Sequence, residues 1–407
     1  MIILLLMIGI IFFIISKNIT DKDLKKRVFK YVIIGLIFQS LLFVLYRMNL
    51  QYIGREVYFS DSEMYWEATK AVMRGEDTDA YNKTYIYMCV AIQKTSIFTW
   101  VGWNNIFNIL CIDLSIVLIM VIIYNKSTDK KYWNLYFFLF CSIFNPLIVF
   151  SLMRNLKDAL FLLIVVIDGY LLEKSMTKAN KLDIKLLFCL GISIPILYNI
   201  RPWGFLIPLV ALVLYLYQKN SERIGKKKII YILFGIAISC GLIAMIPTAN
   251  ANLRLWLPIV LESFTSRGIL NNILGIGKLF VGPGPIRSMF GDSYFMYSLL
   301  SGNIMCMIGS IMWYLQMPIL IVIIKEPIKF IRNSSAFSKY ILLTELLYII
   351  IYVMQYGGST ELRFRGTLYI MTAAFVLTTF DLKLNNKKLC IALMIFMILL
   401  MSNLFFI

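Results

Sequence analysis

Apolar residues form long runs along the whole chain, and short polar segments separate these runs. A run of about 15 to 20 apolar residues is the pattern of an α-helix that crosses the hydrocarbon core of a bilayer. The pattern predicts an all-α polytopic membrane protein with about twelve transmembrane helices, folded as a single integral membrane domain over residues 1–407. The expected spans lie at about residues 2–16, 28–46, 106–124, 135–152, 159–172, 186–200, 203–217, 229–246, 294–324, 340–355, 367–379 and 389–407.

Basic residues gather in every second connection between these runs. The first basic connection, residues 17–30, and five later ones hold well over half of the 40 lysine and arginine residues. Short basic connections stay in the cytoplasm, so the alternation predicts which ends of the helices face inward. The two long connections, residues 48–103 and 248–293, are then expected on the outer, extracytoplasmic side. The abundance of Ile, Lys and Asn is typical of a low-GC bacterium, so we expect a bacterial plasma membrane.

Composition narrows the class of protein further. The chain is 60% hydrophobic and 15% charged, which excludes soluble classes. Cytoplasmic loops account for most of the net charge of +18, so no nucleic acid partner is predicted. The absence of histidine argues against Ser-His hydrolases and His-ligated metal sites. The scattered cysteines predict no disulfide framework. We expect no metal site; an ion held by acidic residues would be an oxygen-liganded one such as Mg or Mn.

The first outer connection is the one place where carboxylates gather. We expect interfacial helices here, because Tyr65, Ala68 and Val72, and then residues 85–100, have the spacing of apolar helix faces that rest on a bilayer surface. The later acidic residues of this connection fit a solvated loop. The carboxylates are Asp61, Glu63, Glu67, Glu76, Asp77 and Asp79, and the aromatic residues among them are Tyr58, Tyr65, Trp66 and Tyr81.

Lysine and arginine residues are usually concentrated in cytoplasmic loops, so those predicted on the outer side need a separate explanation. Several arginines that converge from different loops suit a phosphate or diphosphate, because each guanidinium forms bidentate hydrogen bonds. For any single arginine the alternative is a side chain that snorkels to the lipid headgroups. The charged residues of the short outer connections and the second long one include Arg154, Lys157, Asp158, Arg201, Arg287, Glu361, Arg363 and Arg365.

The order of these features resembles the GT-C superfamily of membrane glycosyltransferases, and in particular bacterial family-39-like enzymes. The resemblance rests on the acidic first outer loop and on four later segments, and it extends over roughly residues 46–379. One departure is Gly366, Thr367 and Leu368, where relatives commonly have a proline-containing sequence. The four segments are FNPLIVFSLMRNLKDAL, NIRPWGFLIPL, a GPGP loop followed by WYLQMP, and ELRFRGTLYI.

The resemblance implies an inverting sugar transfer from a polyprenyl-phosphate donor. Asp61, and next Glu63, match the carboxylate that acts as general base on the acceptor hydroxyl. The alternative for Asp61 is that it only caps the helix that follows. The resemblance also implies that the donor phosphate contacts Arg201, Arg363, Arg365, Arg154 and Lys157. Further site candidates are Asp158, Tyr65, Glu361 and Arg287.

Three function classes remain open on the sequence. The first is the glycosyltransferase, with a glycan or lipid-linked acceptor and membrane lipid as its other partners. The second is a polysaccharide polymerase of the O-antigen or capsule type, and the third is a lipid-linked oligosaccharide flippase. Carboxylates predicted at membrane depth are relevant to the transport function of a flippase. Among these, Asp113 either lines a proton or cation path or is hydrogen-bonded inside the bundle.

Overall fold

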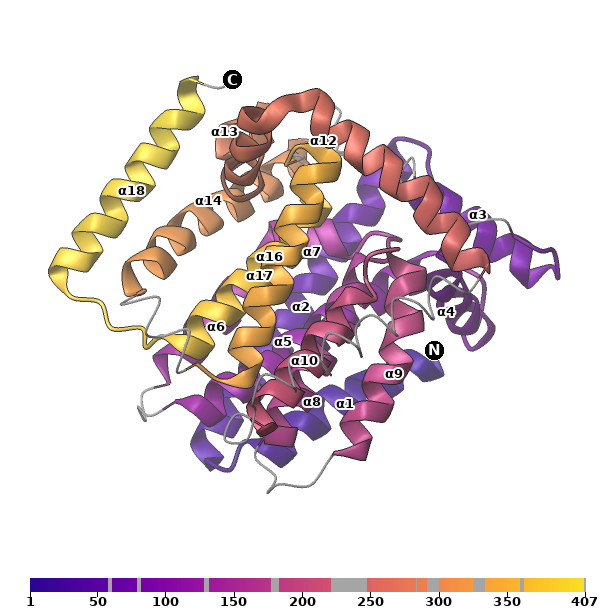
Figure 1. Ribbon diagram of the computed structural model, residues 1–407. Helices are drawn as coiled ribbons and strands as arrows, with labels where there is room; N and C mark the ends of the chain where they lie inside the picture. The colour runs from indigo at the N-terminus through magenta and orange to yellow at the C-terminus, as the bar shows by residue number, and fades with distance from the viewer. Residues whose placement is uncertain are drawn as a thin grey trace. The chain divides into compact units, whose positions relative to one another are not determined.

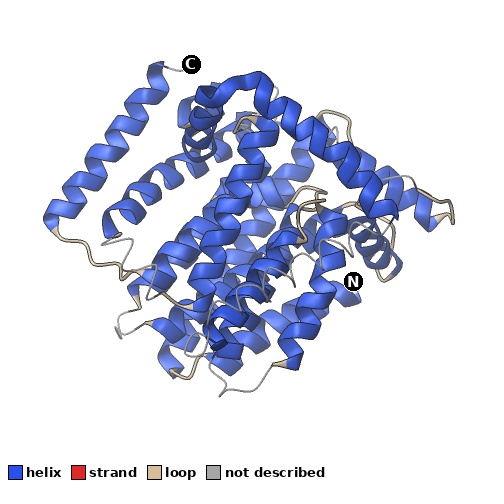
Figure 2. Ribbon diagram, viewed as in Figure 1, coloured by secondary structure: helices blue, strands red, loops and turns tan. Residues whose placement is uncertain are grey.

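The computed structural model is helical throughout the part of the chain that it describes, as predicted from the apolar pattern (Figures 1 and 2). The described residues are 1–57, 61–78, 82–127, 132–176, 183–220, 247–282, 284–290, 300–324, 334–358 and 362–405. In chain order the helices are α1 (Ile2–Asn18), α2 (Lys22–Tyr52), α3 (Asp61–Met73), α4 (Lys83–Lys94), α5 (Gly102–Lys126), α6 (Trp133–Ile143), α7 (Pro146–Leu152), α8 (Asp158–Met176), α9 (Ile184–Ile200), α10 (Leu206–Asn220), α12 (Pro247–Val281), α13 (Pro285–Phe290), α14 (Leu300–Ile323), α16 (Ala336–Tyr356), α17 (Leu362–Thr379) and α18 (Asn386–Phe405).

Five of these helices are long and apolar enough to cross a membrane, namely α2, α5, α14, α16 and α18. The pair α6 and α7 would add a sixth span if the two count as one broken helix. Three shorter apolar helices, α1, α9 and α10, lie below this length. The prediction of a membrane protein is therefore confirmed, whereas the described residues support five or six spans and not twelve. The span predicted at residues 229–246 lies outside the described residues.

The chain divides into two compact units. The first unit comprises Met1–Leu163, Phe280–Asn333 and Thr360–Ile407. The second comprises Ile164–Leu279 and Ser334–Ser359. The single membrane domain expected for residues 1–407 stays a prediction.

Contacts at the helix ends of the first unit define the directions of its helices. The amino group of Met1 donates to the Thr95 carbonyl oxygen over 2.7 Å, just before α5 begins. At the other end, the hydroxyls of Thr20 and Tyr124 lie 2.9 Å apart, where α5 is about to end. Helices α1 and α5 therefore run in the same direction and pack on each other, and α2, which comes between them in the chain, runs the opposite way, with Phe43 and Arg47 near its end beside Trp100. This alternation is the one that the basic connections predict.

A bend separates α6 from α7, where a single span was predicted over residues 135–152. The two helix axes differ by 54°. Asn145 begins a new helix here, since its Oδ1 accepts hydrogen bonds from the amides of Leu147 and Ile148, and Pro146 occupies the first helical position. Its Nδ2 donates to the Gly309 carbonyl oxygen of α14. The sequence Asn145-Pro146 therefore explains why the chain bends between α6 and α7.

The first outer connection contains two helices, α3 and α4, as predicted, but their apolar faces contact protein. Tyr65 and Ala68 are buried, with exposures of 1% and 8%, and α3 packs against α4. Tyr65 meets Tyr85 of α4 edge to face, with ring centroids 5.5 Å apart. The prediction that Tyr65 and Ala68 rest on the bilayer surface is therefore wrong, because the two helices bury these residues against one another and their neighbours.

The remaining helices of the first unit hold the two ends of α17. Asn134, at the start of α6, donates to the carbonyl oxygens of Leu377 and Phe380 at the end of α17. Trp313 of α14 stacks on Tyr369 of α17, with ring centroids 3.7 Å apart. The end of α17 therefore lies beside the start of α6, and its beginning points toward the opposite end of the unit, where α7 finishes.

The second unit contains most of α8 together with α9, α10, α12 and α16. The second of the two long connections, which was predicted on the outer side, is helical along α12, with a break at Gly268, whose φ of 74° is in the left-handed region. Arg267, beside this break, donates to the carbonyl oxygens of Val353, Met354 and Gln355 and thereby caps the end of α16. Within this unit the Ser193 hydroxyl donates to Asp168 over 2.7 Å.

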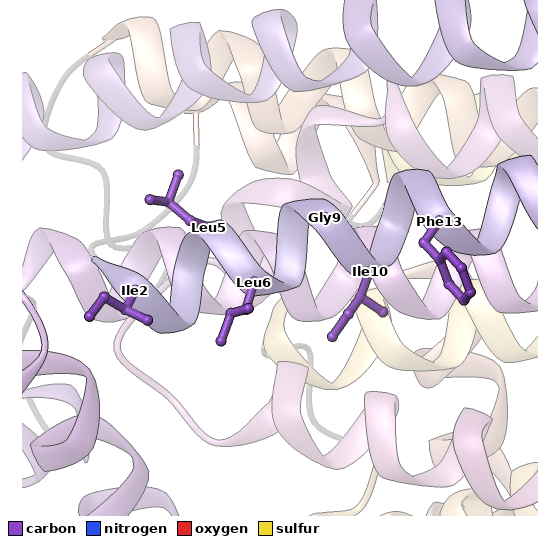
Figure 3. Close-up of a pocket in the computed structure, with 6 residues that line it drawn as sticks. All are labelled: Ile2, Leu5, Leu6, Gly9, Ile10 and Phe13. Atoms are coloured by element: carbon purple, nitrogen blue, oxygen red, sulfur yellow. The ribbon is translucent and has the colours of Figure 1, made fainter.

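One face of α1 carries only apolar side chains at the surface of the first unit (Figure 3). A shallow depression of about 400 Å³ runs along it, lined by Ile2, Leu5, Leu6, Gly9, Ile10 and Phe13. An apolar face of this kind is expected where a helix contacts lipid.

Candidate functional site

The turn between α7 and α8 buries three charged side chains. Arg154 and Lys157 are 4% and 9% exposed, and Asp158, the first residue of α8, is 1% exposed. The sequence predicted this turn as a short outer connection, whereas the structure encloses it. Buried charges of this kind are retained only where neighbouring groups hold them, so the contacts around the turn decide its role.

Two asparagines of α5 hold the backbone of this turn, and a third, Asn104, contacts its Asn155 side chain. Asn105 donates to the Met153 carbonyl oxygen over 2.9 Å. Asn108 donates to the carbonyl oxygens of Arg154 and Leu156. Irregular backbone at membrane depth needs such donors, because its carbonyl groups have no helical partners. Sequence reasoning missed these asparagines, although their clustering at 104, 105 and 108 within an apolar span was a usable signal.

Asn155 connects the turn to the acidic outer connection. Its Nδ2 donates to the Ser62 carbonyl oxygen over 2.9 Å. Its Oδ1 accepts hydrogen bonds from the Tyr85 hydroxyl and from Asn104 Nδ2, both at 3.1 Å. Burial raises the pKa of Tyr85 well above its usual value, so the hydroxyl keeps its proton and remains a donor. Asp61 is therefore next to Ser62, whose carbonyl oxygen is hydrogen-bonded to the turn that contains Arg154 and Lys157.

Lys157 extends this network toward the start of α4. Its Nζ donates to Asn82 Oδ1 over 2.8 Å and lies 5.9 Å from the centroid of the Tyr65 ring. Asn82 Nδ2 in turn donates to the Tyr65 hydroxyl over 2.8 Å. Lys157 and Tyr65, which the sequence proposed for one site from distant segments, are thus brought together.

The two candidate bases lie in the first turn of α3 and face different surroundings. Asp61 is half-buried, whereas the Glu63 side chain is 48% exposed and its Oε1 lies 3.6 Å from Arg55 Nη1. Residues two positions apart on a helix do not face each other, so the two carboxylates do not point into one cavity. The helix already begins at Asp61. A carboxylate in this first turn is favoured by the helix dipole whatever its chemical role.

The other carboxylates of the first outer connection lie at the surface. Glu67 pairs with Lys70 over 2.7 Å. Glu76 pairs with Arg74 over 2.6 Å, and this hydrogen bond lowers the pKa of the Glu76 carboxyl. Asp77 is 91% exposed. Asp79 lies outside the described residues. In the part of the chain that is described, no three His, Cys, Asp or Glu residues are grouped as metal ligands.

Arg365 lies fully buried in α17 of the first unit. The next residue, Gly366, packs so closely on α7 that a Cβ atom would overlap Ser151 Oγ. Close packing thus gives a physical reason for glycine where the resembling enzymes commonly have proline nearby. Glu361 and the side chains of Arg363 and Arg287 lie outside the described residues.

Arg201 belongs to the second unit, where it follows α9. It is 7% exposed, and its guanidinium carbon lies 5.2 Å from the centroid of the Tyr352 ring. Trp203 meets the Tyr348 and Tyr352 rings edge-on. Arg201 is therefore buried against the Tyr352 ring and does not extend to the surface as a snorkelling side chain would.

Comparison of the chain with models of protein families, with curated proteins and with solved structures gives no match.

Proposed function

We propose that the protein transfers a sugar from a polyprenyl-phosphate donor to a glycan or lipid-linked acceptor on the outer face of a bacterial plasma membrane, in the manner of GT-C glycosyltransferases. One observation carries the proposal. The hydrogen bond from Asn155 to the Ser62 carbonyl oxygen ties the acidic start of α3 to a turn with two buried cations. A base and an anion-stabilising group are the two parts that this reaction requires.

In the proposed reaction Asp61 accepts the proton of the acceptor hydroxyl. The oxygen then attacks the anomeric carbon from the face opposite the phosphate, and the bond between that carbon and the phosphate oxygen breaks. Configuration at the anomeric carbon is inverted, and the lipid phosphate leaves with the bonding electron pair. The half-buried position of Asp61 suits a general base, since it is screened from bulk water without being sealed from substrate.

Lys157 and Arg154 are the proposed groups that stabilise the departing phosphate. Both are buried, and a charge in such surroundings acts more strongly on a developing anion than it would in water. The asparagines that hold the turn fix these cations in advance, so little reorganisation is needed during the reaction. Arg365 and Arg363 of the first unit remain proposed phosphate ligands of the same reaction, with Glu361 and Arg287 as further candidates. The phosphate contact expected for Arg201, in the second unit, stays a prediction.

The test is transfer of radiolabelled sugar by the purified full chain in proteoliposomes that contain a polyprenyl-phosphate sugar. Asp61→Asn is nearly isosteric and should lower the transfer rate at least about a hundredfold. Glu63→Gln should have a smaller effect. The matched control is Glu67→Gln, an exposed carboxylate of the same helix, which should leave the rate unchanged.

The cationic side of the proposal has its own test. Lys157→Gln keeps a hydrogen-bond donor for Asn82 but removes the charge, so the transfer rate should fall at least about tenfold. Lys70→Gln, at a half-buried lysine of α3 that pairs with Glu67, is the control. Full activity of the Asp61→Asn protein, with elution and melting like the unmodified chain, would exclude Asp61 as the base. Full activity of Lys157→Gln would exclude the turn as the phosphate site.

A further inference from the structure

A groove at the outer end of α2 combines two arginines with a tryptophan. It is lined by Arg47, Gln51, Gly54, Arg55 and Trp100 and has a volume of about 360 Å³. All of these residues belong to the first unit. The groove is separate from the buried turn at Arg154 to Asp158, and neither Asp61 nor the cations of that turn line it.

The backbone at the end of α2 places Arg55 at this groove. Gly54 has a φ of 68° in the left-handed region. The amide of Gly54 donates to the Gln51 carbonyl oxygen, and the amide of Arg55 donates to that of Leu50. These two bonds form the Schellman motif that ends many helices, and it requires glycine at this position. Arg55 is thereby turned back beside the last turn of α2.

The backbone of Trp100 is held at the groove by two hydrogen bonds with the side-chain amide of Gln93. Gln93 Oε1 accepts from the Trp100 amide over 2.9 Å, and Gln93 Nε2 donates to the Trp100 carbonyl oxygen over 3.1 Å. The guanidinium carbon of Arg47 lies 5.4 Å from the centroid of the Trp100 ring. Arg47 Nη1 also donates to the Glu56 carbonyl oxygen over 2.7 Å. The Trp100 backbone and the Arg47 side chain are thus held at the groove by hydrogen bonds within the protein.

The lipid-facing stripe of α2 leads directly to this groove. Its exposed apolar residues recur at helical spacing, and Gln51 continues the stripe at the groove. Lys30 and Gln51 are about 30 Å apart along an α-helix, which is the thickness of the hydrocarbon core. The groove therefore lies at the depth of the lipid headgroups. The exposed residues of the stripe are Ile33, Ile34, Ile37, Leu41, Val44 and Met48.

Aromatic residues around Trp100 agree with this depth. Its ring packs against Phe43, Phe98 and Trp103, with centroids 5.5 to 6.2 Å apart. Clusters of tryptophan and phenylalanine at the end of a membrane helix are typical of the interface between the hydrocarbon and the water. The groove accordingly opens where phosphate groups of lipids are concentrated.

Two carboxylates face the arginines, and neither fills the groove. The Glu56 carboxylate is engaged by Trp66 Nε1 at 3.0 Å. The Glu63 carboxylate meets Arg55 at 3.6 Å, and both side chains are more than a third exposed. An ion pair this open to water is weak, so a phosphate with better geometry can displace Glu63 from Arg55.

We propose that this groove binds the phosphate group of an anionic membrane phospholipid. Arg47 and Arg55 donate to the phosphate oxygens, and Trp100 packs against the glycerol and the first methylenes of the acyl chains. Binding releases Glu63 from Arg55. Phospholipid binding is measured without a sugar donor, so its result does not depend on the outcome of the transferase assay.

The test measures phospholipid binding to the purified full chain by native mass spectrometry, with phosphatidic acid as the probe. Arg47→Gln combined with Arg55→Gln should weaken binding of one phosphatidic acid molecule at least about tenfold. Arg47→Lys keeps the charge but loses the fork, so its loss should be smaller yet measurable. Arg74→Gln is the matched control, since Arg74 is an exposed arginine of the same connection that pairs with Glu76.

Two further probes identify the source of the phosphate. Diacylglycerol, which lacks phosphate, should not bind at this site, and soluble glycerol 3-phosphate should not compete at millimolar concentration. Unchanged binding in both Arg47→Lys and the double variant would overturn the proposal, as would an equal loss in Arg74→Gln. Competition by glycerol 3-phosphate would show that the groove takes free phosphate esters and would also overturn it.

Discussion

Asn155 Nδ2 lies 2.9 Å from the Ser62 carbonyl oxygen, and this hydrogen bond joins residues 93 positions apart in the chain. One partner is in the turn after α7 and the other in the first turn of α3. A buried amide that satisfies a backbone carbonyl in this way positions both segments, because leaving either group without a partner would be costly. The relative position of Asp61 and Lys157 depends on this contact.

The first prediction concerns Asn155 itself. Asn155→Asp keeps the acceptor used by Tyr85 and Asn104 but sets a carboxylate against the Ser62 carbonyl oxygen. We expect a loss of about 1–3 kcal/mol in the free energy of unfolding, measured as a lower melting temperature in detergent. Asn199→Asp is the control, because the exposed Asn199 donates to the Pro195 carbonyl oxygen of its own helix. Equal melting of the Asn155→Asp and unmodified proteins would contradict this account.

A second prediction concerns the buried pair of Gln39 in α2 and Asp113 in α5. Gln39 Nε2 donates to Asp113 Oδ1 over 2.8 Å, while Gln39 Oε1 and Asp113 Oδ2 have no hydrogen-bond partner in the described part of the chain. Asp113→Asn supplies a donor for Gln39 Oε1, so the protein should melt at or above its normal temperature. Gln39→Glu should lower it, because two carboxylates would then face each other.

The double variant Gln39→Glu with Asp113→Asn tests the same pair by rescue. It restores an amide opposite a carboxyl group, so it should recover most of the stability lost in Gln39→Glu alone. A melting temperature of Asp113→Asn far below that of the unmodified chain would instead favour a role for the carboxylate itself, such as the ion path considered from the sequence.

A third prediction concerns the contact of α17 with α7. Gly366→Ala places a methyl group against Ser151 and Leu152, and the resulting overpacking should cost about 1–3 kcal/mol of unfolding free energy. Gly9→Ala is the control, since a Cβ there meets nothing within 4 Å and alanine favours the helix. Thermal melts of the two variants check the difference. A Gly366→Ala protein as stable as Gly9→Ala would show that α17 and α7 are less closely packed.

A fourth prediction concerns the sides of the membrane. Asp77, after α3, and Lys383, after α17, are both strongly exposed, but their segments lie at opposite ends of the first unit. In intact cells an impermeant thiol reagent should label Asp77→Cys and leave Lys383→Cys unlabelled until the membrane is opened. Both variants carry Cys390→Ser, which removes an exposed native thiol. Labelling of Lys383→Cys from outside would reverse the sides assigned from the basic connections.

Much of the local structure follows from the sequence. The apolar runs predict the all-helical class, and the alternation of basic connections agrees with the helix directions seen at Met1, Thr95, Thr20 and Tyr124. Helices in the acidic connection follow from the spacing of Tyr65, Ala68 and Val72. These features depend on periodicity and composition, which neighbouring residues determine.

The environment of each side chain was decided only by the tertiary structure. Arg154, Lys157 and Asp158 read as a short exposed connection, yet asparagines about fifty residues earlier in the chain enclose their backbone. Likewise, the apolar face of α3 has the spacing of a lipid-facing surface, but α4 covers it, because periodicity states which face is buried and not what buries it. The groove at Arg47, Arg55 and Trp100 also depends on the tertiary structure. The turn at Gly54 positions Arg55, and Gln93 positions Trp100, but the spacing of these residues in the chain does not predict a common site.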